Sequence, residues 1–100
     1  MQLTVRTVRW SVHALIKLAE VRKYVAQDKP QAAARLALRI TNSVNTLVTF
    51  PYSGREGGLA ETREWTIPGT PYIATYSVGD SHMQILSIHH GMTEQGGAKG

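Results

Sequence analysis

The chain has 100 residues, of which 42% are hydrophobic and 18% are charged. This length and composition are typical of one small globular domain rather than of a disordered chain. The chain has no cysteine, no apolar run of about 18 residues and no secretory signal pattern at residues 1–9, which predicts a soluble, cytoplasmic protein without membrane span, metal site or cofactor. The net charge is +4, but residues 1–39 carry +6 and residues 40–100 carry −2, so any attraction for nucleic acid or an acidic partner belongs to the first part of the chain.

The first predicted elements are a short strand and a helix. Val5–Trp10 alternates β-branched or aromatic residues with polar ones, which is typical of a strand. Ser11 stands where a helix N-cap belongs, and the proline at position 30 is expected to end the helix. Within it, apolar residues recur at helical spacing with Lys17, Glu20 and Lys23 opposite them: Val12, Leu15, Ile16, Ala19 and Val25.

A second helix is the clearest element of the sequence. Pro30 suits its first turn, where a missing N–H costs nothing, and Phe50-Pro51 is expected to stop it. Its apolar residues form one continuous stripe, which comprises Ala33, Leu36, Ala37, Ile40, Val44, Leu47 and Val48. Because the connection between the two helices is very short, we expect them to lie antiparallel as a helical hairpin.

Three strands are predicted after a glycine-containing loop at residues 51–61. They span Thr62–Ile67, Tyr72–Val78 and Met83–His90, with turns at residues 68–71 and 79–81, and such consecutive strands pair antiparallel. The predicted fold is therefore a single α+β domain over residues 1–94, in the order β-α-α-β-β-β, followed by a flexible tail at residues 95–100. Its antiparallel sheet packs one face on the helical hairpin and leaves the other face and the edges open for binding.

Few residues in this arrangement suggest catalysis. Arg63 can bind a phosphate or carboxylate, or it can pair with a neighbouring glutamate. His89 and His90 point to opposite faces of the last strand, where either is a candidate general acid or base or else a structural histidine. Tyr72 and Tyr76 share a strand face and are either core residues or a platform for stacking bases. The sequence holds no phosphate-binding glycine loop, dinucleotide-binding motif or zinc-protease motif.

Several stretches of the sequence carry a family resemblance when they are taken together. They are V-R-W-S before the first helix, K-P-Q-A-A-A-R at the start of the second, L-V-T-F-P-Y-S-G-R, T-R-E-W-T-I-P-G-T-P-Y-I-A-T-Y and I-L-S-I-H-H-G. This set resembles the RelE/ParE family of type II toxin–antitoxin toxins from residue 5 to about residue 92. The resemblance implies a compact β-α-α-β-β-β toxin that is encoded beside an antitoxin.

The family divides by mechanism, and the resemblance implies one of two activities. RelE-type members cut mRNA on the ribosome with positive charge on the open sheet face, and their strand arginine falls on Ile73 here. ParE-type members lack that nuclease set and inhibit DNA gyrase, which is the function we expect. The alternative is an endoribonuclease in which Arg63 binds the scissile phosphate and His90, with Tyr72, moves a proton. A third alternative is a degenerate toxin that has lost its activity and only forms the complex, because few residues suggest a catalytic site.

The basic first half of the chain indicates an acidic partner. A partly disordered acidic chain would cover both the basic helices and the open sheet by adding a helix and an edge strand. The resemblance implies that this partner is a cognate antitoxin encoded alongside, in a 2:2 assembly. We expect its carboxylates to contact Arg22, Lys23, Arg35 and Arg39, and its apolar residues to contact the stripe of the helical hairpin.

Overall fold

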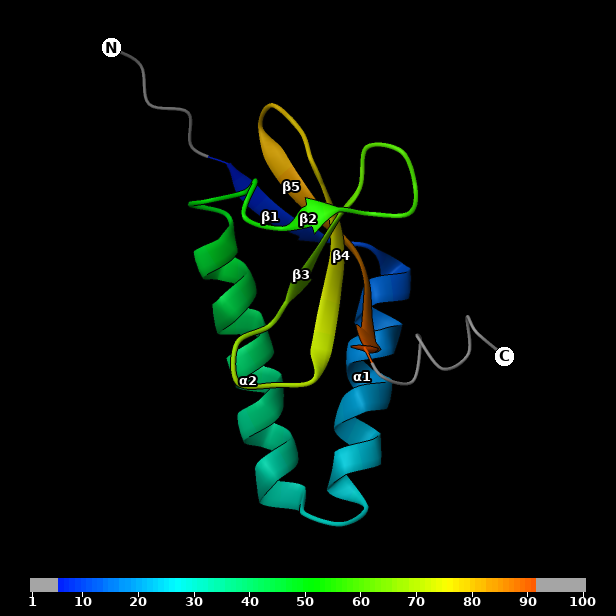
Figure 1. Ribbon diagram of the computed structural model, residues 1–100. Coiled ribbons are helices and arrows are strands. Elements are labelled where there is room, and N and C mark those ends of the chain that lie inside the picture. Colours follow the sequence, from blue (N-terminus) through cyan, green and yellow to red (C-terminus); the bar gives the residue numbers. More distant parts are fainter. Residues whose placement is uncertain (1–5, 92–100) are drawn as a thin grey trace.

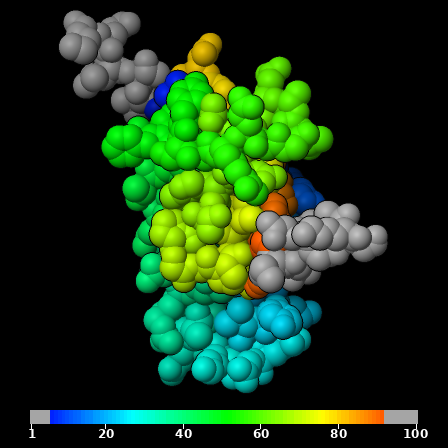
Figure 2. All heavy atoms as spheres, in the orientation of Figure 1, coloured from blue at the N-terminus to red at the C-terminus, as the bar shows by residue number. Residues whose placement is uncertain are grey.

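The computed structural model describes residues 6–91 as a helical hairpin packed on one face of a five-stranded sheet (Figure 1). The elements are β1 (Thr7–Trp10), α1 (Val12–Ala26), α2 (Pro30–Leu47), β2 (Arg55–Glu56), β3 (Arg63–Thr66), β4 (Tyr72–Val78) and β5 (His82–His90). Figure 2 shows that the tip of the hairpin extends beyond the sheet. The predicted α+β class and the predicted order of the helices and the longer strands are confirmed.

Both helices begin where the sequence predicts. The Ser11 hydroxyl accepts a hydrogen bond from the backbone N–H of Ala14 at 3.0 Å, which caps α1. The same hydroxyl donates to the Leu86 carbonyl at 3.2 Å and so ties the start of α1 to β5. Pro30 occupies the first turn of α2, and the short connection makes the two helices antiparallel neighbours.

The sheet has the strand order β1-β5-β4-β3-β2 and is mixed. β3, β4 and β5 pair antiparallel, as predicted, but β1 pairs parallel with β5, so the prediction of a wholly antiparallel sheet is wrong. This pairing places Val8 beside Met83 and Trp10 beside Ile85, and all four contribute to the core. The local sequence patterns that predict strands do not reveal this pairing, because β1 and β5 lie near opposite ends of the chain.

The predicted loop at residues 51–61 contains a further short strand, β2, which is a second correction. Arg55 pairs with Glu64 and Glu56 with Arg63, so opposite charges face each other across the β2–β3 ladder. The predicted turns are confirmed. Gly69 has a φ of 76° in the turn closed by the Thr70 N–H and the Ile67 carbonyl at 3.1 Å, a conformation that favours glycine.

The core lies between the sheet and the helical hairpin. Its largest fully buried side chains belong to α2 and to the sheet, together with Ile67 after β3: Tyr76, Ile40, Ile67, Met83, Ile85, Ile88 and Val44. The stripe of α2 faces this core as the sequence predicts, through Ala33, Ile40, Val44 and Leu47. The end of the domain at residue 94 and the tail at residues 95–100 lie outside the described residues.

The apolar face predicted for α1 is divided in the structure. Ala14 is fully buried and Leu18 and Val21 pack against the core, whereas Val12 is 74% exposed and Ile16 is 51% exposed. The rotation of α1 about its axis is therefore different from the one that the predicted stripe implied. Ala14, Leu18 and Val21 are turned toward the core instead, and the consequence is an apolar outer surface.

Candidate functional site

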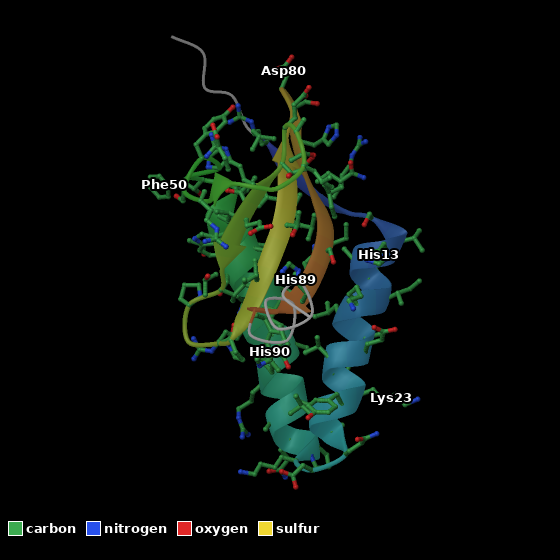
Figure 3. The ribbon with its side chains drawn as sticks, turned by 45° about the vertical axis from the view of Figure 1, so that its right-hand side comes forward. His13, Lys23, Phe50, Asp80, His89 and His90 are labelled. Carbon is green, nitrogen blue, oxygen red and sulfur yellow. The ribbon has the colours of Figure 1, made fainter. Side chains whose placement is uncertain are left out.

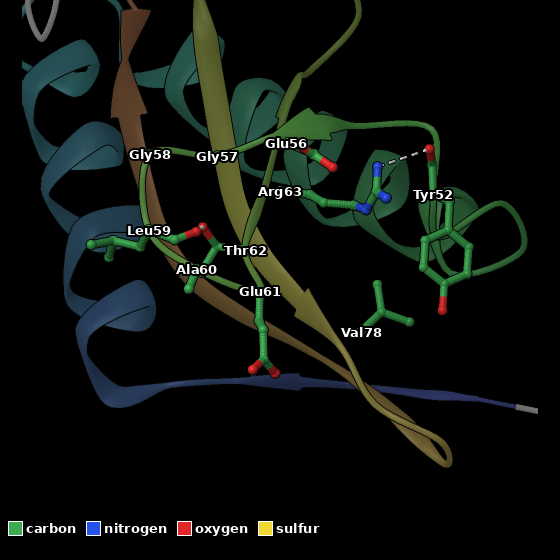
Figure 4. Close-up of a pocket in the computed structure, with 10 residues that line it drawn as sticks. All are labelled: Tyr52, Glu56, Gly57, Gly58, Leu59, Ala60, Glu61, Thr62, Arg63 and Val78. Atoms are coloured by element: carbon green, nitrogen blue, oxygen red, sulfur yellow. Dashed lines mark hydrogen bonds between the residues drawn. The ribbon is translucent and has the colours of Figure 1, made fainter.

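Arg63 lies on the face of the sheet that the helices cover. It pairs with Tyr76 across the β3–β4 ladder, directly opposed residues share a face, and Tyr76 belongs to the core. Its Nη1 donates to the carbonyl of Gly54 at 2.7 Å and to that of Tyr52 at 3.4 Å, and its guanidinium carbon lies 5.0 Å from the centroid of the Tyr52 ring (Figure 4). The guanidinium is thus held by the loop that follows α2, and neither neighbouring glutamate is its ion-pair partner.

A pocket of about 520 Å³ opens beside Arg63 (Figure 4). The loop at residues 56–62 forms one wall, and Tyr52 and Val78 contribute to the others. Glu56 and Glu61 line the same pocket, so it holds two carboxylates and one guanidinium. A phosphate backbone would meet net negative charge here, which makes the pocket a poor site for RNA.

Tyr72 and His90 lie side by side at the opposite end of the sheet. They pair across the β4–β5 ladder, and their ring centroids are 5.4 Å apart with the planes at 82°, an edge-to-face contact. Burial, and then the nearby Tyr24, raise the pKa of the Tyr72 hydroxyl. A pocket of about 480 Å³ between this pair and α1 is also lined by Lys17 and Glu20. His90 is therefore the histidine on the helix side, and His89 lies opposite Ile73 on the open face.

The three candidate catalytic residues do not converge on one point. Arg63 pairs with Tyr76 of β4, whereas His90 pairs with Tyr72 of the same strand. Tyr72 and Tyr76 are four residues apart along β4, a distance on the order of 13 Å at about 3.3 Å per residue. Tyr72 and His90 can act together, but Arg63 cannot reach the group that they would contact.

The open face of the sheet carries two arginines among the described residues, Arg9 on the β1 edge and Arg55 on the β2 edge. By register, Glu64, Thr75 and Ser87 form one row across it, and Thr66, Ile73 and His89 form the next. Arg55 at the edge donates from Nη2 to Glu64 Oε1 at 3.1 Å, so its charge is compensated. Ile73 places an apolar side chain where the resemblance expects the arginine of the nuclease branch.

The four basic residues predicted to bind a partner are all exposed, but they form two groups. Arg35 and Arg39 lie one helical turn apart on α2 and line a pocket of about 570 Å³ with Gly69, which packs against the Arg39 guanidinium. Arg22 and Lys23 lie in the last turns of α1, and Figure 3 shows Lys23 pointing away from the hairpin. One acidic segment would have to cross the hairpin to meet both groups.

Sequence reasoning missed the outer surface of α1. Val12, Leu15, Ile16 and Ala19 are at i, i+3, i+4 and i+7 and are all exposed, while Val25, which the prediction grouped with them, is half-buried. The signal was present in the helical phase, because at 100° per residue Val25 lies about 80° from Leu15 and more than 100° from Val12, Ile16 and Ala19 around the helix axis. Among residues 6–91 no cluster of His, Asp and Glu could hold a metal ion, and neither helix is long and apolar enough to cross a membrane.

Comparison with known sequences places the chain beside named toxins. A family profile described as the ParE toxin of the type II toxin–antitoxin system parDE matches residues 8–94. Y4kP of Sinorhizobium fredii, named as a candidate toxin, is 38% identical over 85 residues, which cover 85% of this chain and 88% of that protein. Toxin RelE2 of Caulobacter vibrioides is 36% identical over 83 residues, which cover 83% of this chain and 92% of that protein.

Solved structures share the fold at lower identity. A chain of the chromosomal ParDE toxin–antitoxin system from P. aeruginosa superposes with a TM-score of 0.79 at 21% identity, over 86% of this chain and 96% of that one. A chain of the YoeB dimer from Staphylococcus aureus gives a TM-score of 0.53 at 17% identity, over 82% of this chain and 92% of that one. The helical hairpin and the sheet are therefore a shared architecture.

Proposed function

Because the chain belongs to the ParE toxin family of type II toxin–antitoxin systems, we propose that it arrests growth by binding DNA gyrase and that it carries out no RNA cleavage. A toxin of this kind acts by contact, so it needs a rigid, complementary surface and no catalytic group. The target lies in the cytoplasm, which is where we propose that the protein acts. A cognate antitoxin encoded alongside, in a 2:2 assembly, neutralises it.

The observation that carries this proposal is the placement of Ile73 and Arg63. Ribosome-dependent cleavage needs a cation and a proton-transferring group at one phosphate. Ile73 occupies the open-face position at which the nuclease branch holds its arginine, and Arg63 lies on the other face with its guanidinium bonded to Gly54 and Tyr52. Arg63 is therefore too far from Tyr72 and His90 to stabilise a negative charge that develops beside them.

Charge on the open face supports the same choice. RNA is held by Lys and Arg side chains that neutralise its phosphates, so a surface with few free cations binds it weakly. Here Arg55 is paired with Glu64, Arg9 lies on β1 at the opposite edge, and the centre of the face holds Thr75, Ser87 and the buried Ile73. The surface is better suited to a protein target than to a nucleic-acid backbone.

The test is to assay one purified toxin against both targets. We expect it to inhibit DNA supercoiling by gyrase in a dose-dependent manner, and to leave mRNA intact on translating ribosomes. Addition of the antitoxin should restore supercoiling. His90→Gln should retain full gyrase inhibition, since it removes the candidate proton-transfer group without altering the outer surface.

Two results would contradict the proposal. Ribosome-dependent cleavage of mRNA that His90→Gln or Tyr72→Phe abolishes would establish the endoribonuclease alternative instead. A toxin that binds its antitoxin tightly but affects neither gyrase nor mRNA would be degenerate. Each outcome is read from the same two assays with the wild-type chain as the reference.

A further inference from the structure

Large apolar side chains are exposed at the end of the molecule that lies opposite the tip of the helical hairpin, where Figure 3 labels Phe50. Phe50 is 66% exposed, Tyr52 is 60% exposed and Leu59 is 72% exposed. Tyr52 and Leu59 stand on two sides of the pocket of about 520 Å³ (Figure 4), and Phe50 and Tyr52 line an adjoining hollow of about 380 Å³. Exposed apolar side chains that gather on one surface indicate a site of protein contact.

The backbone that carries these side chains is held in place. The Leu59 carbonyl accepts from the backbone N–H of Thr62 at 3.2 Å and from its hydroxyl at 2.7 Å, and the Gly57 N–H donates to the Thr62 carbonyl at 2.8 Å. The Tyr52 ring lies under the Arg63 guanidinium, whose carbon is 5.0 Å from the ring centroid. Exposed side chains on such a loop lose little freedom when a partner binds, so they are suited to be anchors.

The same loop contains a residue in an unfavourable backbone conformation. Glu61 has a φ of 62° and is the only residue other than glycine with a positive φ among residues 6–91. Glycine and asparagine adopt this left-handed conformation more readily than glutamate does. Glu61 is exposed and lines the pocket, so its side chain contributes nothing to the core. A strained residue that the packing does not require is a candidate for a role in binding.

Charge determines which partner fits this surface. Arg55 is bonded to Glu64 at 3.1 Å, and Arg63 is bonded to the backbone carbonyls of the preceding loop. Glu56 and Glu61 make no hydrogen bond or ion pair with any other residue that the structure describes. A partner that presents a lysine or arginine side chain between apolar residues would therefore complement the pocket and its rim.

The two ends of the molecule differ in the sign of their charge. Residues 12–47, which form the hairpin, hold six basic and two acidic side chains, whereas residues 50–64 hold two basic and three acidic ones. An acidic antitoxin segment is attracted to the hairpin and gains nothing from Glu56 and Glu61. A symmetric contact between two copies through this surface would bring these carboxylates together, which like charges disfavour.

We infer that the toxin contacts its protein target through this surface, with Tyr52 and Leu59 as apolar anchors and with Glu56 and Glu61 as the partners of a lysine or arginine side chain that enters the pocket. The inference rests on the proposed action on gyrase, and it adds the surface of the toxin and the chemistry of the target segment. It also places target recognition at the end of the molecule opposite the tip of the hairpin.

The first test replaces Glu61 and measures both activity and stability. Glu61→Asn should raise the toxin concentration that half-inhibits supercoiling by purified gyrase about tenfold, because a charge partner is lost. Its thermal stability should equal or exceed that of the wild type, since asparagine adopts a positive φ more readily. Asp28→Asn is the matched control: it removes one exposed carboxylate at the hairpin tip and should leave inhibition within about twofold. A residue that only supported the loop would not lose activity while keeping stability.

The second test addresses the apolar rim and the charge of the pocket. Leu59→Ser should weaken inhibition about tenfold. Leu38→Ser is its control, because Leu38 is 60% exposed on α2, and it should leave inhibition within about twofold. Glu56→Gln combined with Glu61→Asn should remove most of the dependence of inhibition on salt, since the attraction between the pocket and a basic side chain is screened by ions.

Binding to the protein encoded by the adjacent reading frame completes the test. Glu61→Asn and Leu59→Ser should bind it as tightly as the wild type does and should fail to arrest growth in its absence. A wild-type toxin that does not inhibit supercoiling overturns the proposed function. Inhibition by the wild type that both variants retain in full overturns this surface alone. Variants that lose the adjacent protein together with gyrase would assign the surface to the antitoxin, and that result also overturns the inference.

Discussion

The hydroxyl of Tyr76 donates a hydrogen bond to the carbonyl oxygen of Pro51 at 2.7 Å, in the interior of the protein. The hydroxyl oxygen in turn accepts from the backbone N–H of Gly54 at 2.9 Å. One buried side chain in the central part of the sheet thus satisfies two backbone groups of the loop that follows α2. This loop also supplies the carbonyls that hold Arg63, so the geometry of the pocket depends on Tyr76.

Tyr76→Phe should lower the free energy of unfolding by about 1–3 kcal/mol, because it leaves a buried carbonyl and a buried N–H without their partner. Urea unfolding followed by circular dichroism measures the difference. Tyr52→Phe is the control, since Tyr52 is 60% exposed and keeps its ring under Arg63, and it should change stability by less than about 0.5 kcal/mol. Equal stability of the two variants would show that the buried hydroxyl is dispensable.

Gly54→Ala should be destabilising by about 1–3 kcal/mol through steric overlap. A Cβ at position 54 would lie 2.5 Å from the Tyr76 hydroxyl oxygen and 2.8 Å from the Glu64 carbonyl, and the latter belongs to the backbone and cannot move aside freely. Gly58→Ala provides the matched comparison, because nothing lies within 4 Å of its added Cβ. A Gly54→Ala protein that unfolds at the wild-type temperature would refute this account of the loop.

Stability should decrease as the pH rises above about 10, the ordinary pKa of tyrosine. Burial raises the pKa of Tyr76, although the Gly54 N–H and Arg63 oppose the rise, and burial also raises the pKa of Tyr72. The folded protein therefore keeps these two hydroxyls protonated at a pH at which the unfolded chain has already lost the protons. The resulting stabilisation is fully present below the pKa of the unfolded chain, and it is lost as the pH rises through the pKa of the folded protein. Urea midpoints between pH 8 and 11 should fall less steeply for Tyr76→Phe than for Tyr52→Phe.

Ser11→Ala should cost about 0.5–2 kcal/mol, since it removes the N-cap of α1. The Ser11 hydroxyl bonds to both the Ala14 N–H and the Leu86 carbonyl, so the variant also loosens the start of α1 from β5. Ser11→Thr keeps the hydroxyl and should retain most of the stability. Thermal unfolding of the three proteins checks the order, and a threonine variant as unstable as the alanine variant would contradict it.

Arg63→Ala should destabilise the protein by about 1–3 kcal/mol, because Arg63 makes charged hydrogen bonds to the carbonyls of Gly54 and Tyr52. Arg55→Ala removes only an exposed ion pair with Glu64 and should cost less than about 1 kcal/mol. For each variant, the free energy of unfolding and the ability to arrest growth should both be measured. If Arg63→Ala is as stable as the wild type but harmless to cells, then Arg63 contacts a target rather than supporting the loop.

Local interactions explain which features the sequence determined by itself. The stripe of α2, the Ser11 cap and the Gly69 turn each depend on residues within a few positions of one another, and the structure has all three where the sequence predicts them. Helical periodicity and turn conformation are short-range properties of the backbone, so they can be read without knowledge of the fold.

Only the tertiary structure decided the relationships that determine function. The parallel pairing of β1 with β5, the orientation of His90 toward α1 and the contact of Arg63 with Gly54 all join residues that are distant in sequence or depend on strand register. A shift of one residue in register would exchange the two faces of a strand, and no local pattern specifies it. The exposed stripe of α1 has the same origin: the sequence predicted a single apolar face for α1, and packing of Ala14, Leu18 and Val21 on the core left most of that face outside.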